Sequence, residues 1–139
     1  FQAEDGIRGS LCDWSSDVCS SDLYVSPYDN PLLWTGHSTL VDEIADQLSS
    51  EIKAIVVSVG GGGLLCGVLE GCARRNIRPK VITSETEGAS SFRQAWKAGH
   101  VVTLPGIDSA ATSLGATSCT PVALDRALSH NNDDDSGDI

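Results

Sequence analysis

Basic residues are scarce in this sequence. Nine Lys and Arg stand against nineteen Asp and Glu, which gives a formal net charge of −10 at pH 7. So acidic a chain is a poor match for the phosphates of nucleic acids or of anionic membranes, which argues against both as partners. Long apolar runs are also missing, so nothing predicts a membrane span, and the first residues lack the charged-then-apolar order of a signal peptide.

Metal-binding spacings are absent among the five cysteines, which are Cys12, Cys19, Cys66, Cys72 and Cys119. Cys66 and Cys72 fall in a predicted helix, where a buried free thiol is the ordinary explanation. An odd number of cysteines without such a spacing favours a reducing compartment, and we expect a cytoplasmic protein. The 139 residues are enough for one modest domain.

Glycine, by contrast, is concentrated at one point. An apolar, β-branched run over 54–59 leads into Gly60–Gly63, and apolar residues recur at helical spacing from Leu64. This order predicts a buried strand, a glycine loop and a helix. Four consecutive glycines carry a large entropic cost, which indicates that something approaches the backbone closely. Since a loop at a helix N-terminus presents N–H groups to an anion, we expect a phosphate there; a tight turn without a ligand is the alternative.

The glycines alone do not identify the phosphate. Leu64-Leu65 stands where a Walker-type loop requires Lys followed by Ser or Thr, which argues against a nucleoside triphosphatase. Gly61, Gly63 and Gly67 approximate a dinucleotide fingerprint, and the next predicted strand ends at Glu85, which can hold a ribose hydroxyl. Half of an NAD(P)-binding Rossmann dehydrogenase therefore stays open as an alternative.

Helices and strands alternate along the rest of the chain. We expect Ser38 to cap the first helix and Thr120-Pro121 to start the last one. This order predicts an α/β fold in which helices cover both faces of a parallel sheet and ligands bind at the carboxyl ends of the strands. Gly60 and Glu85 should therefore face one cleft. The predicted helices are about 38–48, 64–75, 89–98 and 121–129, and the predicted strands are 54–59, 80–84 and 101–104.

The segment Ser58–Gly67, Ser-Val-Gly-Gly-Gly-Gly-Leu-Leu-Cys-Gly, closely resembles the phosphate-binding loop of the L-serine/L-threonine dehydratases. These are fold-type II pyridoxal-phosphate enzymes, related to the tryptophan synthase β chain. Residues 27–38, 85–92 and 112–117 resemble the same family, and the likeness covers about 24–130. It implies an incomplete three-layer sandwich with a parallel sheet, as part of the large domain that binds pyridoxal phosphate.

The resemblance also implies a function. The parent protein is expected to be a homodimeric ammonia-lyase that uses pyridoxal 5'-phosphate to convert L-serine or L-threonine to pyruvate or 2-oxobutanoate. Lys53, Lys80 and Lys97 lack the sequence context of the family's Schiff-base lysine, so this fragment alone is expected to be inactive. A non-catalytic remnant of the domain is a further alternative. The expected phosphate cradle is formed by the backbone N–H groups of Gly60, Gly61, Gly62, Gly63 and Leu64.

A monovalent cation, usually potassium, lies near the phosphate loop in these dehydratases. By resemblance, its ligands are the Glu85 carboxylate, the Ser91 hydroxyl and the carbonyl groups of Ala89, Leu114 and Ala116. Oxygen donors at a turn suit such an ion. The alternative is that Glu85 caps the helix that follows it, since a helix N-terminus favours a negative charge.

The two ends of the chain carry no usable pattern. Residues 1–23 resemble translated sequencing-adapter DNA joined to a coding fragment, and we interpret them as an artefactual or disordered leader. Residues 131–139 are acidic and are predicted to form a disordered tail.

Overall fold

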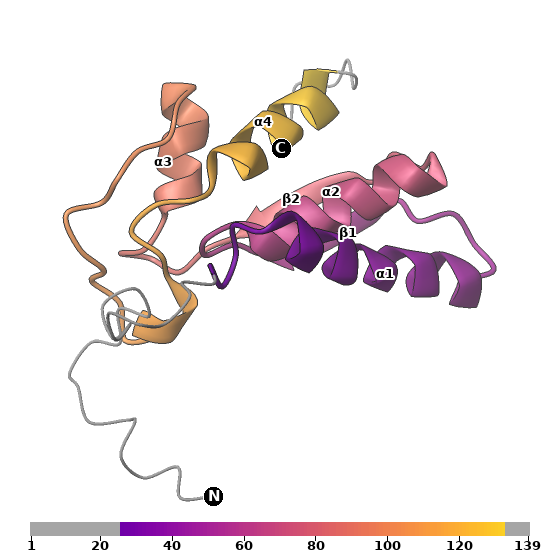
Figure 1. Ribbon diagram of the computed structural model, residues 1–139, viewed down its shortest axis with the longest axis horizontal. Helices are drawn as coiled ribbons and strands as arrows, with labels where there is room; N and C mark the ends of the chain where they lie inside the picture. Colours follow the sequence, from indigo (N-terminus) through magenta and orange to yellow (C-terminus); the bar gives the residue numbers. More distant parts are fainter. Residues whose placement is uncertain (1–25, 133–139) are drawn as a thin grey trace, which may run out of the picture.

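The computed structural model describes residues 26–132, so the predicted leader and most of the predicted tail lie outside the described residues. Among residues 26–132, no helix is both long and apolar enough to cross a membrane. The elements, in chain order, are α1 (Pro31–Gln47), β1 (Ala54–Ser58), α2 (Gly63–Arg75), β2 (Lys80–Ser84), α3 (Ser91–Ala98), the 3-10 turn η1 (Thr112–Leu114) and α4 (Pro121–Asn132) (Figure 1).

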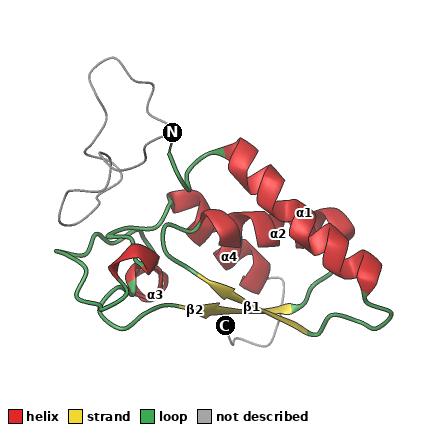
Figure 2. Ribbon diagram, turned by 90° about the horizontal axis from the view of Figure 1, so that it is seen from below, coloured by secondary structure: helices red, strands yellow, loops and turns green. Residues whose placement is uncertain are grey.

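The two strands form a parallel pair, with Ser58 opposite Ser84 at their carboxyl ends. Figure 2 shows α1, α2 and α4 on the same side of this pair. Val57, on the covered face, is buried, whereas the register partners Val56 and Ile82 on the other face are 70% and 39% exposed. The predicted α/β class with parallel strands is confirmed, but in the described part of the chain helices cover only one face of the sheet.

Two predicted elements differ from the structure. Helix α1 begins at Pro31 because Asn30 accepts a hydrogen bond from the N–H of Leu32 and proline occupies the first helical position. The predicted cap Ser38 lies inside α1, fully buried. Residues 101–104 form no strand, because only the N–H of Leu104 makes a backbone hydrogen bond, to the carbonyl of Thr117 at 2.7 Å.

Helix α2 is the centre of the packing. Its buried side chains, which include Leu65 and Val68, contact α1, α4 and β1. Two of its glycines let α1 approach closely: a Cβ atom at Gly67 would lie 2.4 Å from the Cβ of His37, and one at Gly71 would lie 2.7 Å from the carbonyl oxygen of Ser38. These glycines therefore set the distance between the two helices.

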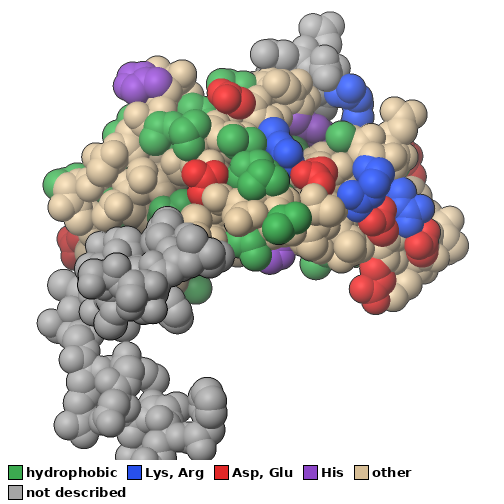
Figure 3. Space-filling model, viewed as in Figure 1, with side chains coloured by type: hydrophobic (Ala, Val, Ile, Leu, Met, Phe, Trp, Pro, Cys, Tyr) green, Lys and Arg blue, Asp and Glu red, His purple; other side chains and the backbone are tan. Residues whose placement is uncertain are grey.

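Ion pairs hold the same two helices together at their carboxyl ends. Asp42 of α1 pairs with Arg74 and Arg75 of α2, and Arg75 also reaches Asp46 at 2.7 Å. Hydrogen bonds from Arg74 and Arg75 lower the pKa of Asp42 below its ordinary value. Figure 3 shows side chains of both charges gathered at this end of the molecule. The pairs are partly exposed, so we expect each of them to add little to the free energy of unfolding. Their main effect should be to set the orientation of α1 relative to α2.

We predict opposite effects of alanine at two helical glycines. Gly71→Ala should destabilise the fold by about 1–3 kcal/mol, because the new methyl group would overlap α1. Gly36→Ala is the matched control: nothing lies within 4 Å of a Cβ there, so better helix propensity should stabilise the fold by about 0.5–1 kcal/mol. Urea unfolding measures both changes. Equal effects at the two positions would show that the close approach of α1 is not a constraint.

Candidate functional site

The glycine loop joins β1 to α2 and lies at the carboxyl end of the strands. Gly62 adopts a left-handed conformation, with φ of +95°, and its carbonyl accepts the N–H of Cys66 in the first turn of α2. Within residues 26–132, the N–H groups of Gly60 through Leu64 donate no hydrogen bond. The loop thus presents five unpaired donors at the positive end of a helix, which is an arrangement that binds anions.

The Tyr28 residue lies directly against this loop. A Cβ atom at Gly61 would lie 2.2 Å from the Tyr28 ring, and one at Gly63 would lie 2.8 Å from the Tyr28 carbonyl oxygen. The indole N–H of Trp34 donates to that same carbonyl at 2.7 Å. The space that a side chain at Gly61 or Gly63 would occupy is therefore filled by the protein itself, at Tyr28. Sequence reasoning missed this contact, because it joins positions about thirty residues apart.

The other two loop glycines meet the segment before and at the start of α4. A Cβ atom at Gly60 would lie 2.8 Å from the carbonyl oxygen of Leu114, and one at Gly62 would lie 2.6 Å from the Cβ of Ala123. The N–H of Thr120 donates to the carbonyl of Gly61 at 2.9 Å. Segments on both sides of the loop therefore hold it, and the packing leaves its own N–H groups unpaired.

Glu85, the predicted cation ligand, caps α3. Its two carboxylate oxygens accept the N–H groups of Phe92 at 2.9 Å and Arg93 at 2.8 Å. This is the alternative role considered from the sequence, and it uses both oxygens in the N-terminal turn of a helix. Because β1 and β2 are parallel, Glu85 and Gly60 follow strand ends at the same edge of the sheet, as expected.

The remaining predicted ligands supply unpaired oxygens. Ser91 is fully buried, and its hydroxyl has no hydrogen-bond partner. Among residues 26–132, the carbonyl oxygens of Ala89, Leu114 and Ala116 also accept no hydrogen bond. The Cβ of Ala89 lies 2.6 Å from where a Cβ at Gly115 would be, so the 85–91 and 112–116 segments lie in contact. An uncompensated buried hydroxyl such as that of Ser91 is costly, which makes this region a candidate for a small cation.

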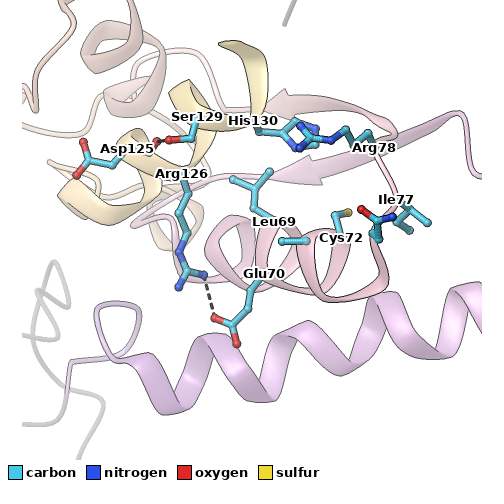
Figure 4. A pocket seen from close by; sticks show the side chains of 11 residues that line it. Leu69, Glu70, Cys72, Ile77, Arg78, Asp125, Arg126, Ser129 and His130 are labelled. Carbon is cyan, nitrogen blue, oxygen red and sulfur yellow. Dashed lines mark hydrogen bonds and ion pairs between the residues drawn. The ribbon is translucent and has the colours of Figure 1, made fainter. Parts of the chain in front are cut away.

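A separate cavity of about 520 Å³ lies between α2 and α4, and Figure 4 shows its lining. Arg126 crosses it to pair with Glu70 at 2.9 Å, and His130 reaches the carbonyl of Pro79 at 3.1 Å. Burial tends to raise the pKa of Glu70, but hydrogen bonds from Arg126 and Thr35 outweigh it and leave that pKa lowered. These paired groups link α4 to α2 and to the segment before β2, so we assign the cavity a structural role.

The buried thiols next to the site are not reactive nucleophiles. Cys66, Cys72 and Cys119 are free and buried, as predicted for the first two. Burial raises the pKa of Cys66 and of Cys72 from 9.0 to about 11. Cys66 lies in the first turn of α2, where a thiolate would benefit from the helix dipole, yet it stays protonated at neutral pH.

The chain belongs to the family of pyridoxal-phosphate dependent enzymes, whose model matches residues 19–137. Among its relatives, the L-serine dehydratase/L-threonine deaminase of Bos taurus is 50% identical over 103 residues, which are 73% of this chain and 32% of the relative. The L-serine dehydratase of Saccharomyces cerevisiae (strain AWRI1631) is 42% identical over 123 residues, which are 83% of this chain and 36% of the relative. The resemblance inferred from the sequence is confirmed.

Solved structures agree with this assignment. The fungal L-serine ammonia-lyase from Rhizomucor miehei superposes with a TM-score of 0.74 at 36% identity, covering 80% of this chain and 36% of that one. Maize serine racemase superposes with a TM-score of 0.67 at 27% identity, covering 73% and 31%. The chain therefore has the fold of these enzymes but spans about a third of the length of its relatives.

We predict that the raised thiol pKa values make stability fall at alkaline pH. The unfolded thiols ionise near pH 9, while the folded ones ionise only near 11. Their contribution is therefore fully present below pH 9 and is lost as the pH rises toward 11. Urea midpoints measured at pH 8, 9 and 10 should decline, and the decline should be shallower in Cys72→Ala. An unchanged slope in that variant would contradict a buried, protonated Cys72.

Proposed function

We propose that the glycine loop holds the phosphate of pyridoxal 5'-phosphate, in a region of an L-serine/L-threonine ammonia-lyase. The observation that carries the proposal is the set of unpaired N–H groups from Gly60 to Leu64 at the N-terminus of α2. Backbone donors at a helix N-terminus suit a phosphate dianion, and charge-assisted hydrogen bonds of this kind are strong. The names of the two relatives given above point to the same substrates, L-serine and L-threonine.

The parent reaction would remove ammonia from the amino acid. When bound, pyridoxal phosphate supplies the electron sink that acidifies the Cα of the substrate. The residues described here would anchor and orient that group by its phosphate. The N–H of Lys80 donates to the carbonyl of Lys53 at the amino ends of the strands, away from the loop, and Lys97 lies on α3. We therefore propose that this chain alone binds the cofactor without catalysing the reaction. From the family resemblance alone, we also propose that the parent is a homodimer.

We predict that one backbone donor can be removed without breaking the helix. Leu64→Pro deletes an N–H in the first turn of α2, where proline is tolerated. It should weaken binding of pyridoxine 5'-phosphate about tenfold. This probe has no aldehyde, so it cannot react with surface lysines, and isothermal titration calorimetry gives its affinity. Leu64→Ala is the matched control, because it removes the same half-exposed side chain but keeps the N–H.

Three outcomes of this titration count against the proposal. Equal affinities of Leu64→Pro and Leu64→Ala would show that the loop does not hold the phosphate. Binding of pyridoxine without its phosphate as tightly as with it would show the same. Tight binding of NAD⁺ and no binding of pyridoxine 5'-phosphate would replace the proposal by a dinucleotide site.

We further propose that potassium binds beside the loop. The buried, unpaired hydroxyl of Ser91 and the unpaired carbonyl oxygens of Ala89, Leu114 and Ala116 fit a monovalent cation. Glu85 would contribute its negative charge from its position as the cap of α3. The ion would compensate oxygens that otherwise lack partners.

We predict that Ser91→Ala separates an occupied site from an empty one. If potassium binds, KCl should raise the urea midpoint of the unmodified chain relative to equimolar tetramethylammonium chloride, and Ser91→Ala should reduce that gain. If no ion binds, removing an unsatisfied buried hydroxyl should stabilise the fold by about 1 kcal/mol in either salt. The second result would overturn the cation site.

A further inference from the structure

Thr120 connects the glycine loop to the turn before α1. Its side chain is buried, at 2% exposure, and its backbone N–H donates to the carbonyl of Gly61 at 2.9 Å. Its hydroxyl donates to the Oδ1 atom of Asp29 at 2.7 Å. Within residues 26–132, the Thr120 bond is the only backbone hydrogen bond between Gly60–Gly63 and a segment beyond α2.

The Asp29 bond completes a ring of contacts around the loop. Asp29 follows Tyr28, whose ring covers Gly61 and whose backbone covers Gly63. Thr120 holds Gly61 by its carbonyl, and a Cβ at Gly62 would lie 3.4 Å from the Thr120 methyl group. The hydroxyl-to-carboxylate bond therefore ties together the two segments that enclose the loop, although neither polar side chain contacts the loop N–H groups.

We propose that Thr120, held by Asp29, is a positioning residue that fixes the direction of the glycine-loop donors; this rests on the proposed function. Glycines restrict their own backbone least, so a loop of four holds a single conformation only if its neighbours impose it. Preorganised donors bind an anion more tightly, because the cost of ordering them is met during folding. The Thr120–Asp29 bond keeps both enclosing segments against the loop and thereby sets its affinity for phosphate.

The test compares variants of the full 139-residue chain in which the Thr120 hydroxyl is removed or kept. Thr120→Val removes the hydroxyl and keeps the backbone N–H and the volume, so pyridoxine 5'-phosphate should bind about tenfold more weakly. Thr120→Ser keeps the hydroxyl and should bind within about twofold of the unmodified chain. Thr103→Val, at an exposed position that makes none of the loop contacts described above, is the matched control and should change nothing. Adding Asp29→Ala to Thr120→Val should cause no further loss, because both act on one bond.

A second measurement separates this inference from the proposed function. ¹⁵N relaxation of the Gly60–Gly63 amides should show added motion in Thr120→Val and none in Thr103→Val, with no ligand present. If that motion appears but the unmodified chain binds no pyridoxine 5'-phosphate, the proposed function fails and the positioning role stands. If Thr120→Val binds as tightly as the unmodified chain and its loop is equally rigid, the positioning role is overturned. Should Thr120→Val not fold, Asp29→Ala, at an exposed side chain, must give the same loss of affinity, and unchanged binding there would overturn the inference.

Discussion

The burial of α2 is the constraint on which the rest of this structure depends. The helix contacts α1, β1 and α4, and Gly67 and Gly71 let α1 pack against its backbone. Arg126 adds a polar link: it donates to the carbonyl of Cys66, pairs with Glu70 and lies 5.0 Å from the centre of the Trp34 ring. A helix held by apolar packing, glycine contacts and this arginine cannot rotate or slide without losing several contacts at once.

The position of the glycine loop is set by that helix. Its last residue, Gly63, is the first residue of α2, and its first, Gly60, follows β1 closely. The loop is thus short and fixed at both ends, and Tyr28 and Thr120 enclose it from the sides. The N–H groups of Gly60 to Leu64 stay unpaired. The neighbouring segments therefore contact carbonyl groups and Cα atoms of the loop, and its N–H donors remain available to a ligand.

Local pattern was enough to predict the strand, loop and helix around the glycines. The strand at 80–84 was predicted correctly, because apolar periodicity and breakers operate over a few residues. The predicted start of α1 was wrong. Ser38 resembles an N-cap, but Asn30 followed by Pro31 is the stronger start signal and begins the helix. The resemblance supplied the roles proposed for the loop and for the cation ligands, and these roles stay predictions. Neither it nor the local pattern predicted the contacts of Tyr28 and Thr120, which bring together residues distant in the sequence.

The net charge of the chain limits how the loop can attract a phosphate. At −10, the protein repels anions at long range, so any affinity for a phosphate must come from groups in direct contact with it. Charges farther away than the screening length, about 8 Å at physiological ionic strength, contribute little. Hydrogen bonds from fixed backbone donors act at contact distance, and their strength depends on direction. Backbone donors hold a phosphate well only when their directions are fixed, which is why the neighbours of this loop matter as much as its donors.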